Sequence, residues 1–164
     1  MLDLGNSPIK RSDLYEDIKT IVDEKAWLRH KSLGPPLWDF PDDGVEREER
    51  NVRSGKWGKY WGEWRVDTNV PHGKGVKVWA TDGRMYWGHF MNGVPNHFGW
   101  LVAGSGPNEG NEYEGFWVDG FFHGKGWFSW NDGWSYNGEW NWSMMNGIGE
   151  FKWPDGGRYI GDWV

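Results

Sequence analysis

Residues 113–136 read YEGFWVDGFFHGKGWFSWNDGWSY, and this stretch predicts the fold. It opens on Tyr-x-Gly-x-Trp, in which alternate residues share one face if the segment is a β-strand. It continues through the pair Gly124 and Gly126 to a turn at Asp132-Gly133. Asp-Gly between two alternating runs favours a hairpin turn, because glycine adopts positive φ without steric cost. We therefore expect this stretch to form one β-hairpin.

The same unit returns along the chain after residue 50. Each copy has a tyrosine, a glycine two residues later and a further aromatic residue two positions on. The copies are Tyr60, Gly62, Trp64; Tyr86, Gly88, Phe90; Tyr113, Gly115, Trp117; Tyr136, Gly138, Trp140; and Tyr159, Gly161, Trp163. One hairpin cannot bury its own rings, so several must stack into a single antiparallel sheet with a ladder of packed aromatic side chains. Glycine in a strand often marks a position that another group approaches closely. We therefore expect a ring from the neighbouring strand to lie over each glycine.

This pattern resembles the MORN repeat family, with four full repeats and a half repeat over residues 60–164. Residues 136–159 depart from the motif, with Ser143 in place of the turn glycine and Asn146 in place of the usual histidine. The resemblance implies a mainly β fold, an elongated antiparallel sheet of consecutive hairpins. It also implies a scaffold, a dimerisation module or a membrane tether, and phosphoinositide contact has been proposed for some members of the family.

Residues 1–50 follow another pattern. Apolar residues recur there at helical spacing and predict an amphipathic helix, ended by Gly34-Pro35-Pro36; they are Leu14, Ile18, Ile21, Val22 and Leu28. This helix would either lie on the rest of the chain or dock onto a partner, and the charged residues 39–53 would form a linker. We therefore expect two domains, residues 1–50 with the helix and linker and residues 51–164 with the hairpins.

Composition excludes several kinds of function. The chain has no cysteine, which rules out a disulfide scaffold, a thiolate zinc site and a cysteine nucleophile. Its formal net charge is −6, and its basic residues are scattered, so we expect no nucleic-acid partner. No secretion signal is visible in residues 1–15. The charge-free run Met85–Asn108 contains glycine and proline and is not expected to span a membrane.

We find no pattern that indicates catalysis, and we expect no cofactor and no metal site. His72 and His123 precede paired glycines, where a histidine that bonds the backbone of a turn is the favoured interpretation. We expect His89 to point away from the ring ladder and to lie at the surface. Glu63 and Glu139 occupy one position of the repeat and are expected on a solvated face.

Two features predict contact with other proteins. Apolar pairs stand at the hairpin tips, where the family usually carries charge: Val94, Pro95, Phe121, Phe122, Met144 and Met145. Neighbouring tips lie about 10 Å apart, so these pairs would form one apolar strip. The strip folds back onto the sheet or the helix, binds another protein or, as the least favoured alternative, inserts into a membrane. The terminal strand with Tyr159, Gly161 and Trp163 leaves an edge that a partner or residues 1–50 would cover.

The favoured function is a non-catalytic scaffold, an accessory subunit of a larger protein assembly that binds other subunits through its hairpin tips, its terminal edge strand or its N-terminal helix. One alternative is a peripheral membrane adaptor that contacts phospholipid headgroups. A weaker alternative is a carbohydrate-binding module that uses exposed tryptophans. An intracellular location is favoured, in the cytoplasm, a cilium, or a complex in a mitochondrion or plastid.

Overall fold

The computed structural model describes residues 43–56 and 58–164. The chain divides into two units, Met1–Pro35 and Pro36–Val164, and every described residue belongs to the second. The helix that the sequence predicts within residues 1–50 lies outside the described residues.

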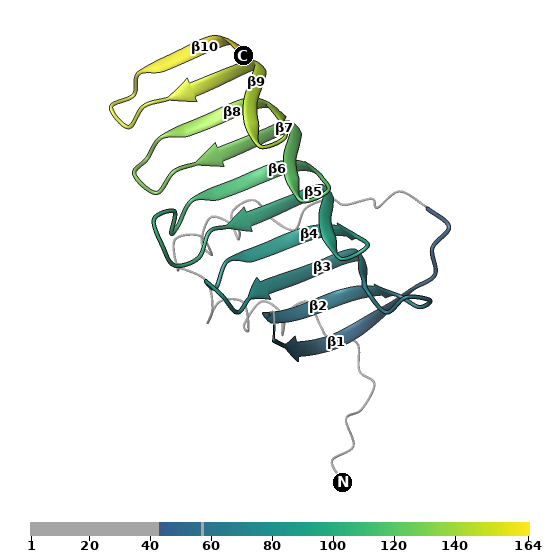
Figure 1. The fold of residues 1–164 in the computed structure, drawn as a ribbon. Helices are drawn as coiled ribbons and strands as arrows, with labels where there is room; N and C mark the ends of the chain where they lie inside the picture. The colour runs from purple at the N-terminus through teal and green to yellow at the C-terminus, as the bar shows by residue number, and fades with distance from the viewer. Residues whose placement is uncertain (1–42, 57) are drawn as a thin grey trace. The chain divides into compact units, whose positions relative to one another are not determined.

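Ten antiparallel strands form a single sheet in the described part of the chain (Figure 1). They are β1 (Arg47–Gly55), β2 (Gly58–Arg65), β3 (Pro71–Trp79), β4 (Met85–Met91), β5 (Val94–Val102), β6 (Glu112–Val118), β7 (Phe121–Ser129), β8 (Ser135–Asn141), β9 (Met144–Lys152) and β10 (Arg158–Trp163). Strands that follow one another in the chain are neighbours in the sheet, from β1 to β10. The predicted mainly β fold of consecutive hairpins is therefore confirmed.

Strand β1 corrects the prediction of a linker over residues 39–53. Residues 47–55 pair with β2, with Arg47 opposite Arg65 and Gly55 opposite Gly58. The segment is rich in charge and lacks the alternation that predicts a strand. It nevertheless pairs with the edge of β2 on both sides of a register shift between Arg50 and Arg53, and an edge strand tolerates charged side chains.

Glycines line up across the sheet in one row. Each is paired with the next through the registers of β2 to β10: Gly62, Gly75, Gly88, Gly99, Gly115, Gly126, Gly138, Gly149 and Gly161. The tyrosine two residues before the first glycine of a hairpin lies over both glycines of that hairpin. A Cβ at Gly126, for example, would lie 2.6 Å from ring atoms of Tyr113. The row therefore provides the space in which the tyrosine rings lie.

This geometry corrects one detail of the expectation. The ring over the first glycine of each pair comes from its own strand, because the tyrosine lies along the strand and its hydroxyl donates to the carbonyl three residues on. These bonds are 2.9–3.0 Å long and run from Tyr60 to Glu63, Tyr86 to His89, Tyr113 to Phe116 and Tyr136 to Glu139.

The rings form the buried core of the sheet, which we call the ladder face. Its buried members are Tyr60, Trp64, Tyr86, Phe90, Tyr113, Trp117, Tyr136 and Trp140. Each tyrosine meets the aromatic residue of the following repeat edge-on, as in the 5.1 Å contact of Tyr86 with Trp117 and the 5.5 Å contact of Tyr113 with Trp140. Edge-to-face ring pairs at this distance stabilise beyond simple burial. The predicted packing of the ladder rings agrees with the structure.

Candidate functional site

Tight turns, which we call the tips, join the two strands of each hairpin at the same end of the strands. Asn92-Gly93 and Asp119-Gly120 both have positive φ at both residues, as in the type I′ turns that match strand twist. Each turn also bonds back to the preceding hairpin, since Gly93 N–H donates to the Pro71 carbonyl at 2.8 Å and Gly120 N–H donates to the Pro95 carbonyl at 2.8 Å. These hydrogen bonds therefore fix the position of each tip relative to the tip before it.

The apolar pairs at the tips divide between two environments. The second member of each pair belongs to the ladder side: Phe122 stacks on Tyr113 with ring centroids 3.7 Å apart, Met145 packs against the core, and Pro95 lies opposite Phe90. The first member is exposed, namely Val94 at 41%, Phe121 at 47% and Met144 at 64%. Alternation along the strand separates them, so only the first members can present an apolar surface.

Trp142 joins these exposed residues, and the sequence analysis did not identify it as an interaction residue. It is 50% exposed and its ring centroid lies 5.5 Å from that of Phe121. Trp142 and Ser143 form the turn between β8 and β9, where the tips of β4–β5 and β6–β7 have Asn-Gly and Asp-Gly. Both residues have positive φ, 50° for Trp142 and 64° for Ser143. A bulky residue in this backbone conformation is uncommon and costs stability. We call Val94, Phe121, Trp142 and Met144 the tip strip.

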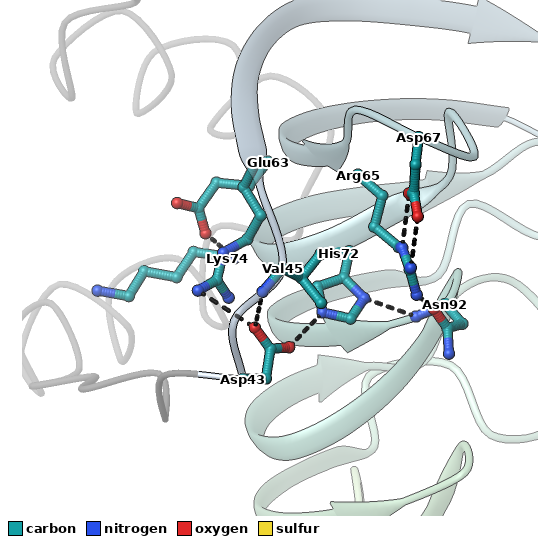
Figure 2. A network of polar contacts seen from close by, with 9 residues as sticks. Asp43, Val45, Glu63, Arg65, Asp67, His72, Lys74 and Asn92 are labelled. Atoms are coloured by element: carbon teal, nitrogen blue, oxygen red, sulfur yellow. Dashed lines mark hydrogen bonds and ion pairs between the residues drawn. The ribbon is translucent and has the colours of Figure 1, made fainter.

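Polar contacts surround the tip of the first hairpin, β2–β3, and reach Asn92 in the turn of the second, β4–β5 (Figure 2). His72 is buried, and its Nε2 lies 2.6 Å from the Asp43 carboxylate. Its Nδ1 accepts the backbone N–H of Asn92 at 3.2 Å. Arg65 donates to both carboxylate oxygens of Asp67, at 2.9 and 2.7 Å, and to Asn92 Oδ1 at 2.8 Å. This network ties the segment before β1 to two successive tips.

The carboxyl groups of this network, Asp43 and Asp67, are stabilised in their ionised form. Arg65 lowers the pKa of Asp67 to about 2 through its hydrogen bonds. Burial acts to raise the pKa of Asp43, but hydrogen bonds from His72 and the Val45 N–H, together with the charge of Arg47, lower it overall. These groups therefore keep their charges at neutral pH.

The pair of His72 and Asp43 resembles half of a catalytic triad but lacks the required geometry. Because Nδ1 accepts the Asn92 N–H, Nε2 carries the proton and donates it to Asp43. A general base needs a free lone pair directed at a nucleophile, and both ring nitrogens of His72 are engaged. The pair therefore acts as a structural tie, as expected for a histidine that bonds the backbone of a turn.

Comparison with known proteins fits this geometry. Residues 69–84, 113–135 and 136–158 match the family model of the MORN repeat. The chain contains MORN repeats. In the structure, the second and third of these segments correspond to the hairpins β6–β7 and β8–β9.

Similar curated proteins include Alsin of Homo sapiens and Alsin of Pan troglodytes, each 30% identical over 139 residues, and Alsin of Mus musculus, 31% identical over 143 residues. Each alignment covers 77% of this chain but only 8% of the relative. The likeness to Alsin therefore concerns a small part of a much longer protein.

Two further residues named in the sequence analysis, His89 and Glu63, lie as follows. His89 is buried at 2% exposure, so the expectation of a surface histidine is wrong. It does face away from the ladder, and its ring centroid lies 6.2 Å from that of His97. Burial lowers the pKa of His89 to about 4, and the nearby charges of His97, Lys74 and Arg47 act in the same direction. Glu63, expected on a solvated face, is half-buried and accepts the Lys74 N–H at 2.5 Å.

Strand β10 is the last of the sheet, and in the described part of the chain only β9 pairs with it. Tyr159 is 46% exposed and Trp163 is half-buried, with its Nε1–H donating to the Gly149 carbonyl at 3.3 Å. Its predicted coverage by a partner or by residues 1–50 stays a prediction.

No group of three or more His, Asp or Glu side chains within residues 43–56 and 58–164 could hold a metal ion. Among the same residues there is no helix long and apolar enough to cross a membrane.

Proposed function

We propose that this chain is a non-catalytic MORN-repeat interaction module that binds another protein through the tip strip, as an accessory part of a larger assembly. The observation that supports this most directly is Trp142. A hairpin turn is most stable with Asn-Gly or Asp-Gly, and this turn instead places an indole in strained backbone geometry with half of its surface exposed. Strain of this kind concentrates at functional positions.

The neighbours of Trp142 support the same function. Phe121 contacts it from the preceding hairpin, and Met144 follows it in the chain. Aromatic residues and methionine are enriched where proteins bind one another, and methionine adapts its shape to a partner. The hydrogen bonds between successive turns hold these side chains in place before binding, which reduces the entropic cost of association.

The experiment compares two sets of substitutions in the full chain by affinity purification and mass spectrometry. The tip variant carries Val94→Ser, Phe121→Ser, Trp142→Ser and Met144→Ser. The control variant carries Phe116→Ser and Ile148→Ser, which remove exposed apolar residues away from the tips. Circular dichroism first checks that both variants keep the sheet.

The proposal expects a specific set of proteins to co-purify with the wild type and the control and to be lost from the tip variant. Retention of the same proteins by the tip variant would contradict it. Binding of the wild type, but not of the tip variant, to phosphatidylserine vesicles with no protein partner would instead favour the membrane adaptor.

A further inference from the structure

Three of the loops that join consecutive hairpins share one frame, at the end of the strands away from the tips (Figure 1). Each begins with a tryptophan whose backbone N–H donates to the carbonyl of the residue that closes the loop. Each also has an Asp-Gly pair whose aspartate accepts the N–H of the closing residue. The tryptophan, the aspartate and the closing residue are Trp79, Asp82 and Arg84 after β3; Trp130, Asp132 and Trp134 after β7; and Trp153, Asp155 and Gly157 after β9. The three loops can therefore be compared position by position.

The first of these loops has cations of its own over the tryptophan. The guanidinium carbon of Arg84 and the ammonium nitrogen of Lys77 both lie 4.8 Å from the centroid of the Trp79 ring. Asp82 pairs with the same guanidinium, with its Oδ2 3.8 Å from Nε of Arg84. A cation over an indole is attracted by the negative face of the ring, and a guanidinium can stack there and still bond a carboxylate. The indole and the carboxylate of this loop thus hold one guanidinium together.

The two later loops keep the indole and the aspartate but lack both cations. The closing residue is Trp134 in one and Gly157 in the other. At the position of Lys77, opposite the tyrosine of the next strand, the chain has Phe128 or Phe151. The positive charge that the first loop supplies from its own side chains is therefore missing from the other two.

Aromatic rings gather around the two later loops in one cluster. Phe151 lies at its centre, and its ring centroid is 5.5–5.7 Å from those of Trp130, Trp134 and Trp153. All four side chains are half-buried, so part of each ring remains open to solvent. We call these four residues the loop cluster.

The charge beside the loop cluster is negative. Asp132 and Asp155 are exposed, and none of the residues that the structure describes forms an ion pair with either of them. The cationic residues of the last two strands, Lys152 and Arg158, both pair with Glu150, at 3.0 and 3.6 Å. Alternation with the ladder residues places Glu150 on the other side of β9. The loop cluster therefore combines ring faces with two carboxylates that no described cation neutralises.

We infer that the loop cluster binds arginine side chains of a partner protein, with one guanidinium in the frame of each later loop. The first loop indicates which group fits, because it holds the guanidinium of Arg84 on an indole and beside an aspartate. The two later frames are two strand spacings apart, about 10 Å. Arginines three residues apart in a polyproline II segment point the same way about 9 Å apart, so an Arg-x-x-Arg sequence matches both frames. The net charge of −6 also attracts such a segment.

The test measures binding of the peptide Gly-Arg-Pro-Pro-Arg-Gly to the full chain through the NMR chemical shifts of the tryptophan indole N–H groups. Trp142, at the tips, is the internal control. The first variant carries Asp132→Asn and Asp155→Asn, which keep a side-chain acceptor in each turn and remove both charges. Its matched control carries Asp119→Asn and Asp162→Asn, which remove two exposed charges away from the loop cluster.

A second pair of variants tests the place of the guanidinium. Gly157→Arg puts into the last loop the arginine that the first loop has, where it should occupy the site in place of the peptide. Gly157→Gln adds an uncharged side chain at the same position. A peptide with citrulline in place of both arginines makes the test independent of any substitution in the protein.

We expect the peptide to shift the indole signals of Trp130, Trp134 and Trp153 but not that of Trp142. The citrulline peptide, which keeps the shape and loses the charge, should bind about tenfold more weakly. If none of the three indole signals shifts at millimolar peptide, or if both peptides bind equally well, the inference is wrong.

The variants should rank in the same way. Loss of Asp132 and Asp155 should raise the Kd of the peptide about fivefold, while the matched control stays close to the wild type. Gly157→Arg should weaken binding more than Gly157→Gln does. An equal loss in the two aspartate variants, or in the two Gly157 variants, would overturn the inference. Binding of phosphocholine in preference to the peptide would also overturn it, because the cation would then belong to a lipid headgroup.

Discussion

The ladder face is nearly identical in every repeat, whereas the other face of the same strands, which we call the opposite face, changes from apolar to polar between β2 and β10. Both faces share one backbone and one register. The ladder places a tyrosine over a glycine pair in each repeat, and the opposite face has tryptophan and valine at one end and asparagine and lysine at the other. The comparison indicates that the ladder determines the fold, and that the residues of the opposite face and of the tips can vary without changing it.

The largest expected effect tests the ladder directly. Trp140→Ala removes a buried indole and should lower the free energy of unfolding by about 3–5 kcal/mol. Asn137→Ala, three residues earlier on the opposite face, should change it by less than about 0.5 kcal/mol. Chemical denaturation measures both. Equal effects of the two substitutions would show that the two faces contribute equally to the free energy of unfolding.

Adding a methyl group to the glycine row should cost nearly as much. Gly126→Ala directs a Cβ at the ring of Tyr113, 2.6 Å away, and the crowded core should lose about 3 kcal/mol of stability. Gly157→Ala is the milder comparison, because its Cβ would lie 3.1 Å from the partly exposed ring of Trp153 in a loop, where a shift of a few tenths of an ångström relieves the contact. A stable Gly126→Ala protein would mean that the tyrosine can move aside.

The opposite face should respond to pH through His89. Its pKa is about 4 in the folded chain and about 6.5 when unfolded, so the unfolded chain binds more protons between these values. Stability should therefore fall by about 2–3 kcal/mol as the pH drops from 6.5 to 4. His89→Leu should reduce this loss, and His123→Gln should retain it. A wild-type stability that stays constant over this range would contradict the prediction.

A smaller effect concerns the tyrosine hydroxyls. Tyr136→Phe removes the 3.0 Å hydrogen bond to the Glu139 carbonyl and keeps the ring, so it should cost about 1 kcal/mol. Differential scanning calorimetry of this variant beside Trp140→Ala separates the hydrogen bond from the ring packing. A loss as large as that of Trp140→Ala would mean that the hydroxyl, and not the ring, sets the ladder geometry.

Much of the ladder could be predicted from the sequence because its signals are local. Tyr-x-Gly-x-Trp places three residues on one face by alternation alone, and Asp-Gly pairs locate the turns. The connection between β5 and β6 is longer, yet it leaves the register intact, with Gly99 still opposite Gly115.

The remaining features depend on contacts between distant residues. Strand β1 has no apolar alternation and forms because β2 offers an unpaired edge. The burial of His89 is set by contacts that no residue near it in the chain predicts. Trp142 has no local signal for exposure, and only its place in a turn with positive φ accounts for it.

The indole N–H groups give the array a direction. Trp117 donates to the Gly99 carbonyl at 3.1 Å, Trp140 to Gly126 at 3.1 Å and Trp163 to Gly149 at 3.3 Å, each time from a later hairpin to the one before it. The turn amides of Gly93 and Gly120 point the same way. A hairpin that leaves the ribosome thus finds its acceptors already in place on the hairpin made before it. Growth of the sheet can follow synthesis, with each finished repeat serving as the template for the next.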